Sequence, residues 1–176
     1  SRGVKSEDRE REFAEYMAAR QPSLLRTAYL LSGDRHTAED LVQTAFAKLY
    51  LAWDRVHERG SMDGYVRRIL VNENNSLWRR AWKRREHARE SLPDQPREDA
   101  YDDGLREAVW DVVQTLPSKA RAVVVLRYYE QMSEAETAQL LGISVGTVKS
   151  QCSRALAALR ETAPVHLNPD HREEER

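Results

Sequence analysis

One stretch of the chain places cations and aromatic rings side by side: residues 71–86, with the sequence VNENNSLWRRAWKRRE. It opens with polar residues that disfavour a helix and continues with Arg and Lys interleaved with Trp78 and Trp82. Cations bind nucleic-acid phosphates, and aromatic rings can stack on unpaired bases. The stretch is therefore a candidate for contact with nucleic acid. Because Trp78 and Trp82 are spaced i, i+4, we favour core packing over base stacking for both rings.

A second pattern with chemical meaning spans residues 133–160, SEAETAQLLGISVGTVKSQCSRALAALR. Its first helix is predicted over residues 134–141, Gly142 allows a left-handed turn, and Ser144 can cap a second helix through residue 160. A small residue stands where the two helices must cross, and apolar residues stand where a helix-turn-helix buries its contacts: Ala138, Leu141, Ile143 and Val148. The spacing predicts a helix-turn-helix.

The second helix of such a motif lies in the DNA major groove, with its N-terminal half toward the base edges. The exposed candidates are Ser144, Val145, Thr147, Lys149, Ser150, Ser153 and Arg154. Lys149 and Arg154 carry donors on long stems, so we predict that they contact phosphate or guanine, while Ser144 and Thr147 meet phosphate. Cys152 is interpreted as a small buried hydrophobe rather than a redox sensor, because no second cysteine can resolve it.

The formal net charge of −1 hides a strong asymmetry along the chain. Residues 67–89 hold eight Arg or Lys against two Glu, whereas residues 90–107 hold seven acids against two Arg. One-sided clustering of cations is typical of nucleic-acid binding, although a solvated helix face can look the same. Charge by itself leaves both interpretations open.

The composition indicates a helical protein of the cytoplasm. Of 176 residues, 40% are hydrophobic and 32% charged, and only seven are glycine, which favours amphipathic helices over a β-rich fold. The single cysteine excludes an internal disulfide and fits a reducing compartment. The longest aliphatic run, residues 122–126, is far too short to span a bilayer, and the N-terminus has no apolar signal core. No membrane insertion is expected.

Helical periodicity organises the first half of the chain into one domain, residues 1–90. Two short helices are predicted around Pro22, closed by residues 32–34. Residues 37–40 resemble a capping box before an apolar series that ends at Trp53. A further helix is predicted from residue 62 to a polar turn at residues 72–75.

The second half contains an acidic spacer and another helical domain. Residues 91–104 hold two prolines, a glycine and several acids, which predicts a flexible linker. Periodicity resumes over residues 105–161, with a capping box at residues 133–136, and residues 162–176 are predicted to be a disordered tail. The predicted fold class is all-α: an N-terminal helical bundle and a C-terminal helix-turn-helix domain joined by a flexible acidic linker.

These segments resemble those of the bacterial sigma-70 family, specifically its small extracytoplasmic-function group. Residues 116–160, LPSKARAVVVLRYYEQMSEAETAQLLGISVGTVKSQCSRALAALR, are similar to the domain that reads the −35 element. AEDLVQTAFAKLYLAW, residues 38–53, is similar to the helix that docks on the polymerase β′ coiled coil. MDGYVRRILVNENNSLWRRAWKRRE, residues 62–86, is similar to the segment that reads and opens the −10 element. The resemblance covers about residues 12–161 and is strongest to the actinobacterial branch.

The resemblance implies a transcription initiation factor with RNA polymerase core, through its β′ and β subunits, and promoter DNA as partners. It also implies an anti-sigma factor. Core contact is implied for Asp40, Gln43 and Thr44. Capture of a flipped −10 base is implied for a loop made of Asn72, Glu73, Asn74 and Asn75. The cations after it would follow the backbone of the strand that enters this loop: Arg79, Arg80, Lys83 and Arg84.

This chain departs from the family pattern at several of these positions. Gln151 and Leu156 stand where many relatives carry arginine, which implies weaker phosphate anchoring and leaves the −35 preference open. Residues 72–75 also differ from the common versions, so the preferred −10 base is open.

Other classes of function fit the sequence less well. The five histidines lack metal-ligand spacing, and neither a phosphate-binding glycine loop nor a nucleophile elbow is present, so we expect no enzyme, metal, cofactor or small-molecule substrate. The chief alternative is a helix-turn-helix regulator of the response-regulator type, which binds duplex DNA without acting as a polymerase subunit. It would need a strand-rich sensor domain, and residues 1–90 show no strand pattern. A third class is an adaptor that only binds another protein through its helices. It fits only if the basic segment, residues 67–89, binds no nucleic acid.

Overall fold

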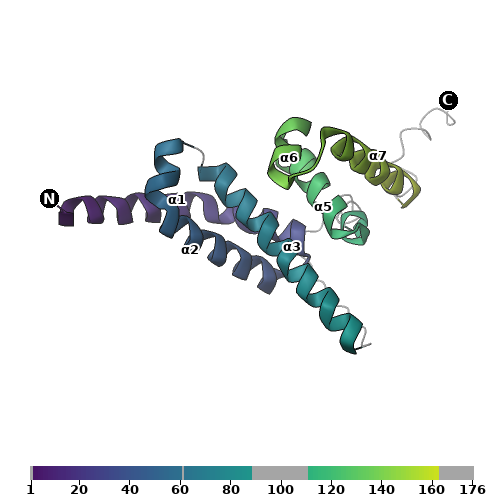
Figure 1. The fold of residues 1–176 in the computed structure, drawn as a ribbon, viewed down its shortest axis with the longest axis horizontal. Coiled ribbons are helices and arrows are strands. Elements are labelled where there is room, and N and C mark those ends of the chain that lie inside the picture. The colour runs from purple at the N-terminus through teal and green to yellow at the C-terminus, as the bar shows by residue number, and fades with distance from the viewer. Residues whose placement is uncertain (1, 61, 89–110, 163–176) are drawn as a thin grey trace, which may run out of the picture. The chain divides into compact units, whose positions relative to one another are not determined.

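A computed structural model describes residues 2–60, 62–88 and 111–162 (Figure 1). The elements are α1 (Arg2–Ser32), α2 (Arg35–Arg59), α3 (Met62–Ala88), α5 (Ser118–Val124), the π-helix η1 (Val125–Tyr129), α6 (Glu134–Leu141) and α7 (Val145–Thr162), and residues 111–115 are also helical. Within these described ranges no residue is in a strand, so the predicted all-α class is confirmed.

Contacts between residues divide the chain into two units, Ser1–Leu77 and Trp78–Arg176. The division falls inside α3, which runs without a break to Ala88. The predicted linker at residues 91–104 and the predicted tail, apart from Thr162, lie outside the described residues. The predicted domain boundaries therefore stay predictions.

The first unit begins with one long helix, so the prediction of two short helices around Pro22 is wrong. Pro22 lies inside α1. A proline in a helix interior costs about 3 kcal/mol. Leu24, Ala28 and Leu31, all buried, follow it on the face that packs on α2. Burying each leucine contributes roughly 1.5–3 kcal/mol, which offsets the cost of the proline.

α2 begins three residues earlier than the predicted capping box. Asp34 has extended backbone angles and is the N-cap, because its Oδ2 accepts bonds from Thr37 N at 3.0 Å and Thr37 Oγ1 at 2.7 Å. Burial alone would raise the pKa of Asp34, but the bonds from Thr37 outweigh burial and lower it below its ordinary value. The prediction that residues 37–40 form the cap is therefore wrong, and Asp34 stabilises this helix start.

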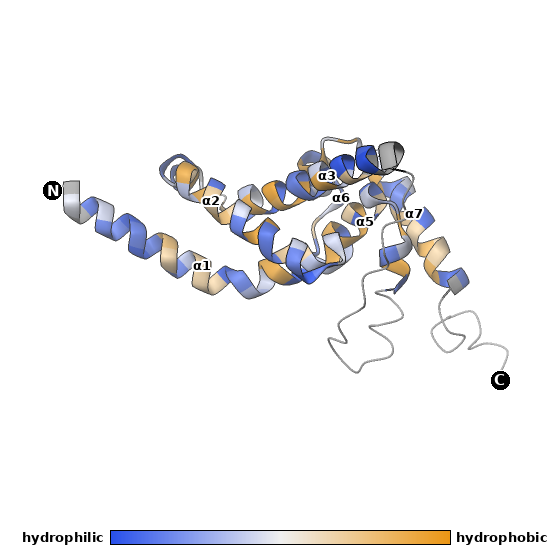
Figure 2. Cartoon of the chain, turned by 90° about the horizontal axis from the view of Figure 1, so that it is seen from below, coloured by the Kyte–Doolittle hydropathy of each residue, from blue (hydrophilic) through white to orange (hydrophobic). Residues whose placement is uncertain are grey.

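An aromatic cluster holds α1 on α2. The Phe13 ring meets the rings of Phe46, Tyr50 and Trp53 edge-on, with centroids 6.5, 5.1 and 5.5 Å apart. Hydrophobic residues recur in bands along both helices, separated by hydrophilic ones (Figure 2). This periodicity lets each helix bury one side and expose the other.

The start of α3 is tied to α1 by one carboxylate. Asp63 accepts a bond from Tyr16 Oη at 2.6 Å on one oxygen and pairs with Arg20 at 3.1 Å on the other. Burial, followed by this bond to Asp63, raises the pKa of Tyr16. The contact orients α3 against the bundle.

α3 is continuous through residues 72–75, so the predicted polar turn at this place is wrong. The turn between α2 and α3 includes Gly60, whose φ of 76° is left-handed and whose N–H donates to the carbonyls of Val56 and His57. At residues 72–75 of α3, the low helix propensity of asparagine reduces helix stability by only a few tenths of a kcal/mol per residue. Buried Val66, Leu70 and Val71 outweigh that cost.

The second unit contains the predicted helix-turn-helix, which is confirmed. Ser133 and Glu136 form the capping box of α6, and Gly142 ends that helix at a φ of 67°. The core where α5, α6 and α7 meet consists of Val123, Ala138, Val148 and Cys152, with Leu141 and Ile143 packed against it. Close packing at Ala138 allows α6 and α7 to meet.

One buried arginine joins α5 to the helical residues 111–115 that precede it. Arg121 on α5 is 4% exposed, and its guanidinium donates to the carbonyls of Val113, Gln114 and Leu116 at 3.2, 2.8 and 3.2 Å. These carbonyls lie at and just after the end of the helical residues 111–115, where backbone carbonyls lose their intrahelical donors and a side chain can cap them. Burial lowers the pKa of Arg121, so the guanidinium depends on these bonds.

Across the residues that the structure describes, no helix combines the length and apolar character needed to cross a membrane.

Candidate nucleic-acid interface and docking face

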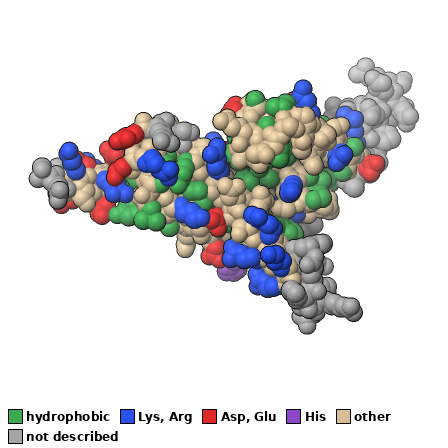
Figure 3. Space-filling view, viewed as in Figure 1, with side chains coloured by type: hydrophobic (Ala, Val, Ile, Leu, Met, Phe, Trp, Pro, Cys, Tyr) green, Lys and Arg blue, Asp and Glu red, His purple; other side chains and the backbone are tan. Residues whose placement is uncertain are grey.

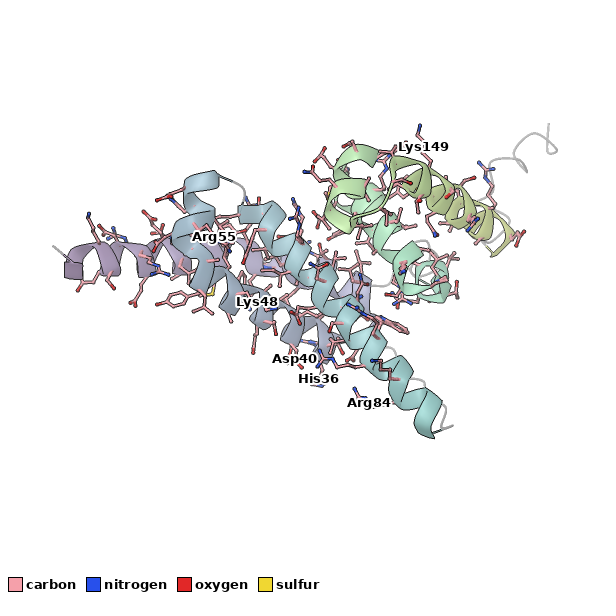
Figure 4. All side chains as sticks on the ribbon, viewed as in Figure 1. His36, Asp40, Lys48, Arg55, Arg84 and Lys149 are labelled. Carbon is pink, nitrogen blue, oxygen red and sulfur yellow. The ribbon has the colours of Figure 1, made fainter. Side chains whose placement is uncertain are left out.

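The outer side of α2 carries the residues predicted to bind polymerase. Asp40 and Gln43 are exposed and Thr44 is half-buried, whereas Leu41, Val42 and other residues of the opposite side are buried. Asp40 and Lys48 can be followed along this helix in Figure 4. The three residues therefore share a face that is open to a partner.

The same face continues into an apolar groove that the sequence interpretation missed. Its lining is Phe13, Met17, Phe46, Ala47, Tyr50 and Leu51. Leu51 is 82% exposed, which is unusual for a leucine beside a groove. The sequence could have indicated this groove, because Leu51 is apolar but lies outside the series of apolar positions that its helix buries. We call Asp40, Gln43, Thr44, Ala47 and Leu51 the docking face.

The outer side of α3 carries the predicted −10 contacts. Residues spaced by three or four along this helix form one stripe opposite its buried side: Arg68, Asn72, Asn75, Arg79 and Lys83. Asn75 is half-buried and the other four are exposed. Arg80 and Arg84, also exposed, flank the stripe, and Lys and Arg side chains gather over the second half of α3 (Figure 3). Arg68 was not among the predicted residues, although its spacing of four from Asn72 could have indicated it.

Two residues of the predicted base-capturing segment face the protein instead of the stripe. Asn74 is 2% exposed, and its Nδ2 donates to the carbonyl oxygen of Leu31 at 3.3 Å. Glu73 is half-buried and pairs with Lys48 of α2. A one-residue step along a helix turns the side chain by about 100°, so four consecutive residues of a helix cannot share one surface as they could in a loop. The assignment of Asn74 to DNA contact is therefore withdrawn.

Both tryptophans of this stretch lie on α3. Trp78 is half-buried, and the side chain of Trp82 lies outside what the structure describes.

The second helix of the motif, α7, presents most of its predicted DNA contacts to solvent. Ser144, Val145, Lys149, Ser150, Ser153 and Arg154 are exposed, Thr147 is half-buried, and Val148, Cys152 and Ala155 form the opposite, buried side. Ser144 Oγ accepts from Thr147 N at 3.0 Å, and Ser150 Oγ donates to the carbonyl of Thr147 at 3.0 Å. Ser144 therefore caps the helix, as predicted.

Cys152 is part of the core rather than of the exposed side of α7. It lies against Tyr128, whose pKa is raised first by burial and then by Cys152. This position accords with a small buried hydrophobe.

A metal has no ready site in the described part of the chain, where no three His, Cys, Asp or Glu side chains gather closely enough to hold an ion.

Comparisons with known proteins identify both halves of the chain. The family model for sigma-70 region 2 matches residues 17–84, and that for sigma-70, region 4 matches residues 106–159. The chain is 46% identical to the RNA polymerase sigma-E factor of Streptomyces coelicolor, over 85% of each chain. It is 32% identical to the ECF RNA polymerase sigma factor SigE of Mycolicibacterium smegmatis, over 80% of this chain and 57% of that protein.

Solved structures resemble the chain as well. The sigma factor RpoE, solved with the anti-sigma factor NepR from Bartonella quintana, has a TM-score of 0.69 and 25% identity over 86% of this chain and 96% of that one. CnrH, solved with the cytosolic domain of CnrY, has a TM-score of 0.60 and 27% identity over 85% and 86%. The match of the N-terminal half to sigma-70 region 2 disfavours a response-regulator type of repressor. The chain belongs to the sigma-70 family, and is an RNA polymerase sigma factor of the extracytoplasmic-function group and of the actinobacterial type.

Proposed function

We propose that this sigma factor uses three separate helix faces to start transcription. The docking face on α2 binds the β′ coiled coil of core polymerase, the stripe on α3 contacts the −10 element, and the exposed side of α7 reads the −35 element. The observation that carries the proposal is that each helix buries one side and leaves most of the residues that match the family pattern exposed on the other, Asn74 being the buried exception. Residues 1–90 would form the first functional domain and residues 105–161 the second.

The docking face has the composition of a protein-binding surface. Asp40 and Gln43 supply polar contacts, and Leu51 beside the apolar groove supplies area that gains free energy when a partner covers it. At about 25 cal/mol per Å² of apolar surface, even a small groove adds to affinity. Contact with the β subunit through the second domain is part of the same proposal.

Energetics explain why the chain needs polymerase. Opening about ten base-pair steps at ~1.4 kcal/mol each costs on the order of 14 kcal/mol. Capturing a flipped base and stacking it on the protein recovers only a few kcal/mol of that cost. The cations of α3 can guide the separated strand through phosphate contacts, but the remaining free energy must come from the enzyme that the docking face binds.

At the −10 element, Asn72 is the exposed amide best placed to meet a base edge, with Asn75 beside it. Arg68, Arg79, Arg80, Lys83 and Arg84 then contact phosphates on either side. At the −35 element, Lys149 and Arg154 supply the phosphate or guanine contacts, and the small side chains of Ser150 and Ser153 let the helix approach closely.

The remaining assignments follow from this role. We propose a cytoplasmic location, because bacterial promoter DNA and polymerase lie there, and a role as a binding factor without catalysis of its own. RpoE, which the chain resembles, was solved in complex with the anti-sigma factor NepR, and this supports an anti-sigma factor as a further partner of this chain. Residues 91–104 are proposed to link the domains, and residues 162–176 to form a tail.

Binding to core polymerase tests the docking face. The variant D40A/Q43A should weaken the binding of the fluorescently labelled full chain to core polymerase by at least tenfold, and Leu51→Ala should weaken it by several-fold. Gln139→Ala, an exposed glutamine of α6, is the matched control and should leave binding unchanged. Equal binding by D40A/Q43A and Gln139→Ala would reject the docking face while leaving the family assignment intact.

A further inference from the structure

One ion pair joins the two helices of the helix-turn-helix. Lys149 Nζ lies 3.9 Å from Glu134 Oε2, with the two side chains 67% and 36% exposed. Glu134 is the first residue of α6. Lys149, which is labelled in Figure 4, lies in the first turns of α7. The carboxylate therefore faces the cation that is proposed to meet DNA phosphate.

The fold does not need this carboxylate as a cap. Ser133 Oγ accepts from Glu136 N at 3.0 Å, and Glu136 Oε1 accepts from Ser133 N at 3.4 Å, so Ser133 and Glu136 complete the capping box by themselves. An acid in the first turn of a helix also interacts favourably with the helix dipole. Glu136, on the same turn, supplies a second acid for that interaction.

From this geometry we infer that Glu134 is an affinity-determining residue of the −35 interface, which holds Lys149 in the free protein and is displaced by a DNA phosphate. The inference rests on the proposed role of α7. A carboxylate and a phosphate compete for the same ammonium, because each supplies anionic oxygens within hydrogen-bonding reach. Glu134 therefore lowers the affinity of α7 for DNA of any sequence.

The size of the effect follows from the exposure of the pair. An exposed ion pair contributes about 0.2–1 kcal/mol, which corresponds to roughly a 1.4- to fivefold change in an equilibrium constant. Lys149 and Arg154 are the two long basic side chains among the proposed −35 contacts. Restraining one of two such cations should have a measurable effect.

A double-mutant cycle on the full chain tests the inference. The probe is a labelled short DNA duplex of randomised sequence, titrated by fluorescence anisotropy at several salt concentrations. Glu134→Gln should tighten binding about two- to fivefold at low salt, with the difference shrinking as salt rises. Lys149→Gln should weaken binding and reduce the slope against salt by about one. In the Lys149→Gln background, Glu134→Gln should have little effect.

Glu136→Gln is the matched control. It removes one negative charge from the same turn, and glutamine can still complete the capping box. If Glu136→Gln tightens binding as much as Glu134→Gln, net charge alone is responsible and the inference is rejected. An effect of Glu134→Gln that persists without Lys149 would also reject it. If Lys149→Gln leaves binding unchanged, the proposed role of α7 fails first, and the inference fails with it.

Discussion

Asn74 of α3 donates a hydrogen bond from its Nδ2 to the carbonyl oxygen of Leu31 at 3.3 Å, and so ties the middle of α3 to the last turn of α1. Leu31 is itself buried, and Asn74 is among the few buried polar residues of the first unit. One of the amides that the resemblance assigns to base capture therefore holds two helices of the bundle together.

Asn74→Ala should lower the free energy of unfolding by about 1–3 kcal/mol, because it removes a buried amide and its hydrogen bond. Asn72→Ala, two residues away and exposed, should change it by less than about 0.5 kcal/mol. Urea denaturation of the full chain followed by circular dichroism measures both. Equal stability of the two variants would show that the contact with Leu31 contributes nothing.

Thr137 has a buried side chain whose Oγ1 meets no hydrogen-bond partner. Thr137→Val should therefore raise the free energy of unfolding by about 1 kcal/mol, because a methyl group replaces an unsatisfied hydroxyl. Thr27→Val is the matched control: Thr27 is equally buried, but its Oγ1 donates to the carbonyl of Ser23 at 3.2 Å. Thermal unfolding should rank Thr137→Val above the wild type and Thr27→Val at or below it. The reverse order would contradict the assignment of Thr137 as unsatisfied.

Arg121→Met should lower the free energy of unfolding by about 3 kcal/mol, because several main-chain carbonyls lose a charged donor. Arg121→Lys should recover only part of this loss, since an ammonium cannot reproduce the planar fork of the guanidinium. Arg154→Met, on the exposed side of α7, provides the comparison and should leave stability nearly unchanged while weakening DNA binding. A loss in Arg121→Met no larger than that in Arg154→Met would rule out the capping role of Arg121.

Acid should remove the contribution of Asp34 to stability. Its folded pKa lies below the ordinary value of 3.8, so its contribution is complete above pH 3.8 and is lost as the pH falls through the folded pKa. Asp34→Ala should cost about 1 kcal/mol at neutral pH, and this gap from the wild type should narrow below pH 3.8. Denaturation curves at a series of pH values measure the gap. A gap that stays constant into acid would mean that the carboxylate charge is not involved.

The parts of the fold that local chemistry determines could be predicted from the sequence. Ser133 and Glu136 form their capping box within one helical turn, and Gly142 adopts its left-handed angle without help from distant residues. The helix-turn-helix depends on such signals together with short-range apolar spacing. Its exposed residues, including Lys149 and Arg154, follow once the buried side of α7 is known.

The parts that distant packing determines could not be predicted. Pro22 is tolerated because leucines after it pack on α2, and residues 72–75 stay helical because α3 lies against the bundle. Neither the helical conformation at Pro22 nor that at residues 72–75 can be predicted from a short stretch of sequence alone. The partners of Asn74 and Glu73 lie 43 and 25 residues away in sequence. Pairing of Lys149 with Glu134 likewise depends on how two helices cross.

Reconstituted transcription tests the central claim most directly. Core polymerase is incubated with the full chain on a library of genomic fragments, and the 5′ ends of the transcripts are mapped. The proposed function predicts that the wild-type chain produces transcripts with defined starts, that Gln139→Ala does so equally, and that D40A/Q43A loses them. Absence of defined starts with the wild-type chain, combined with tight binding of duplex DNA by the chain alone, would contradict its role as an initiation factor.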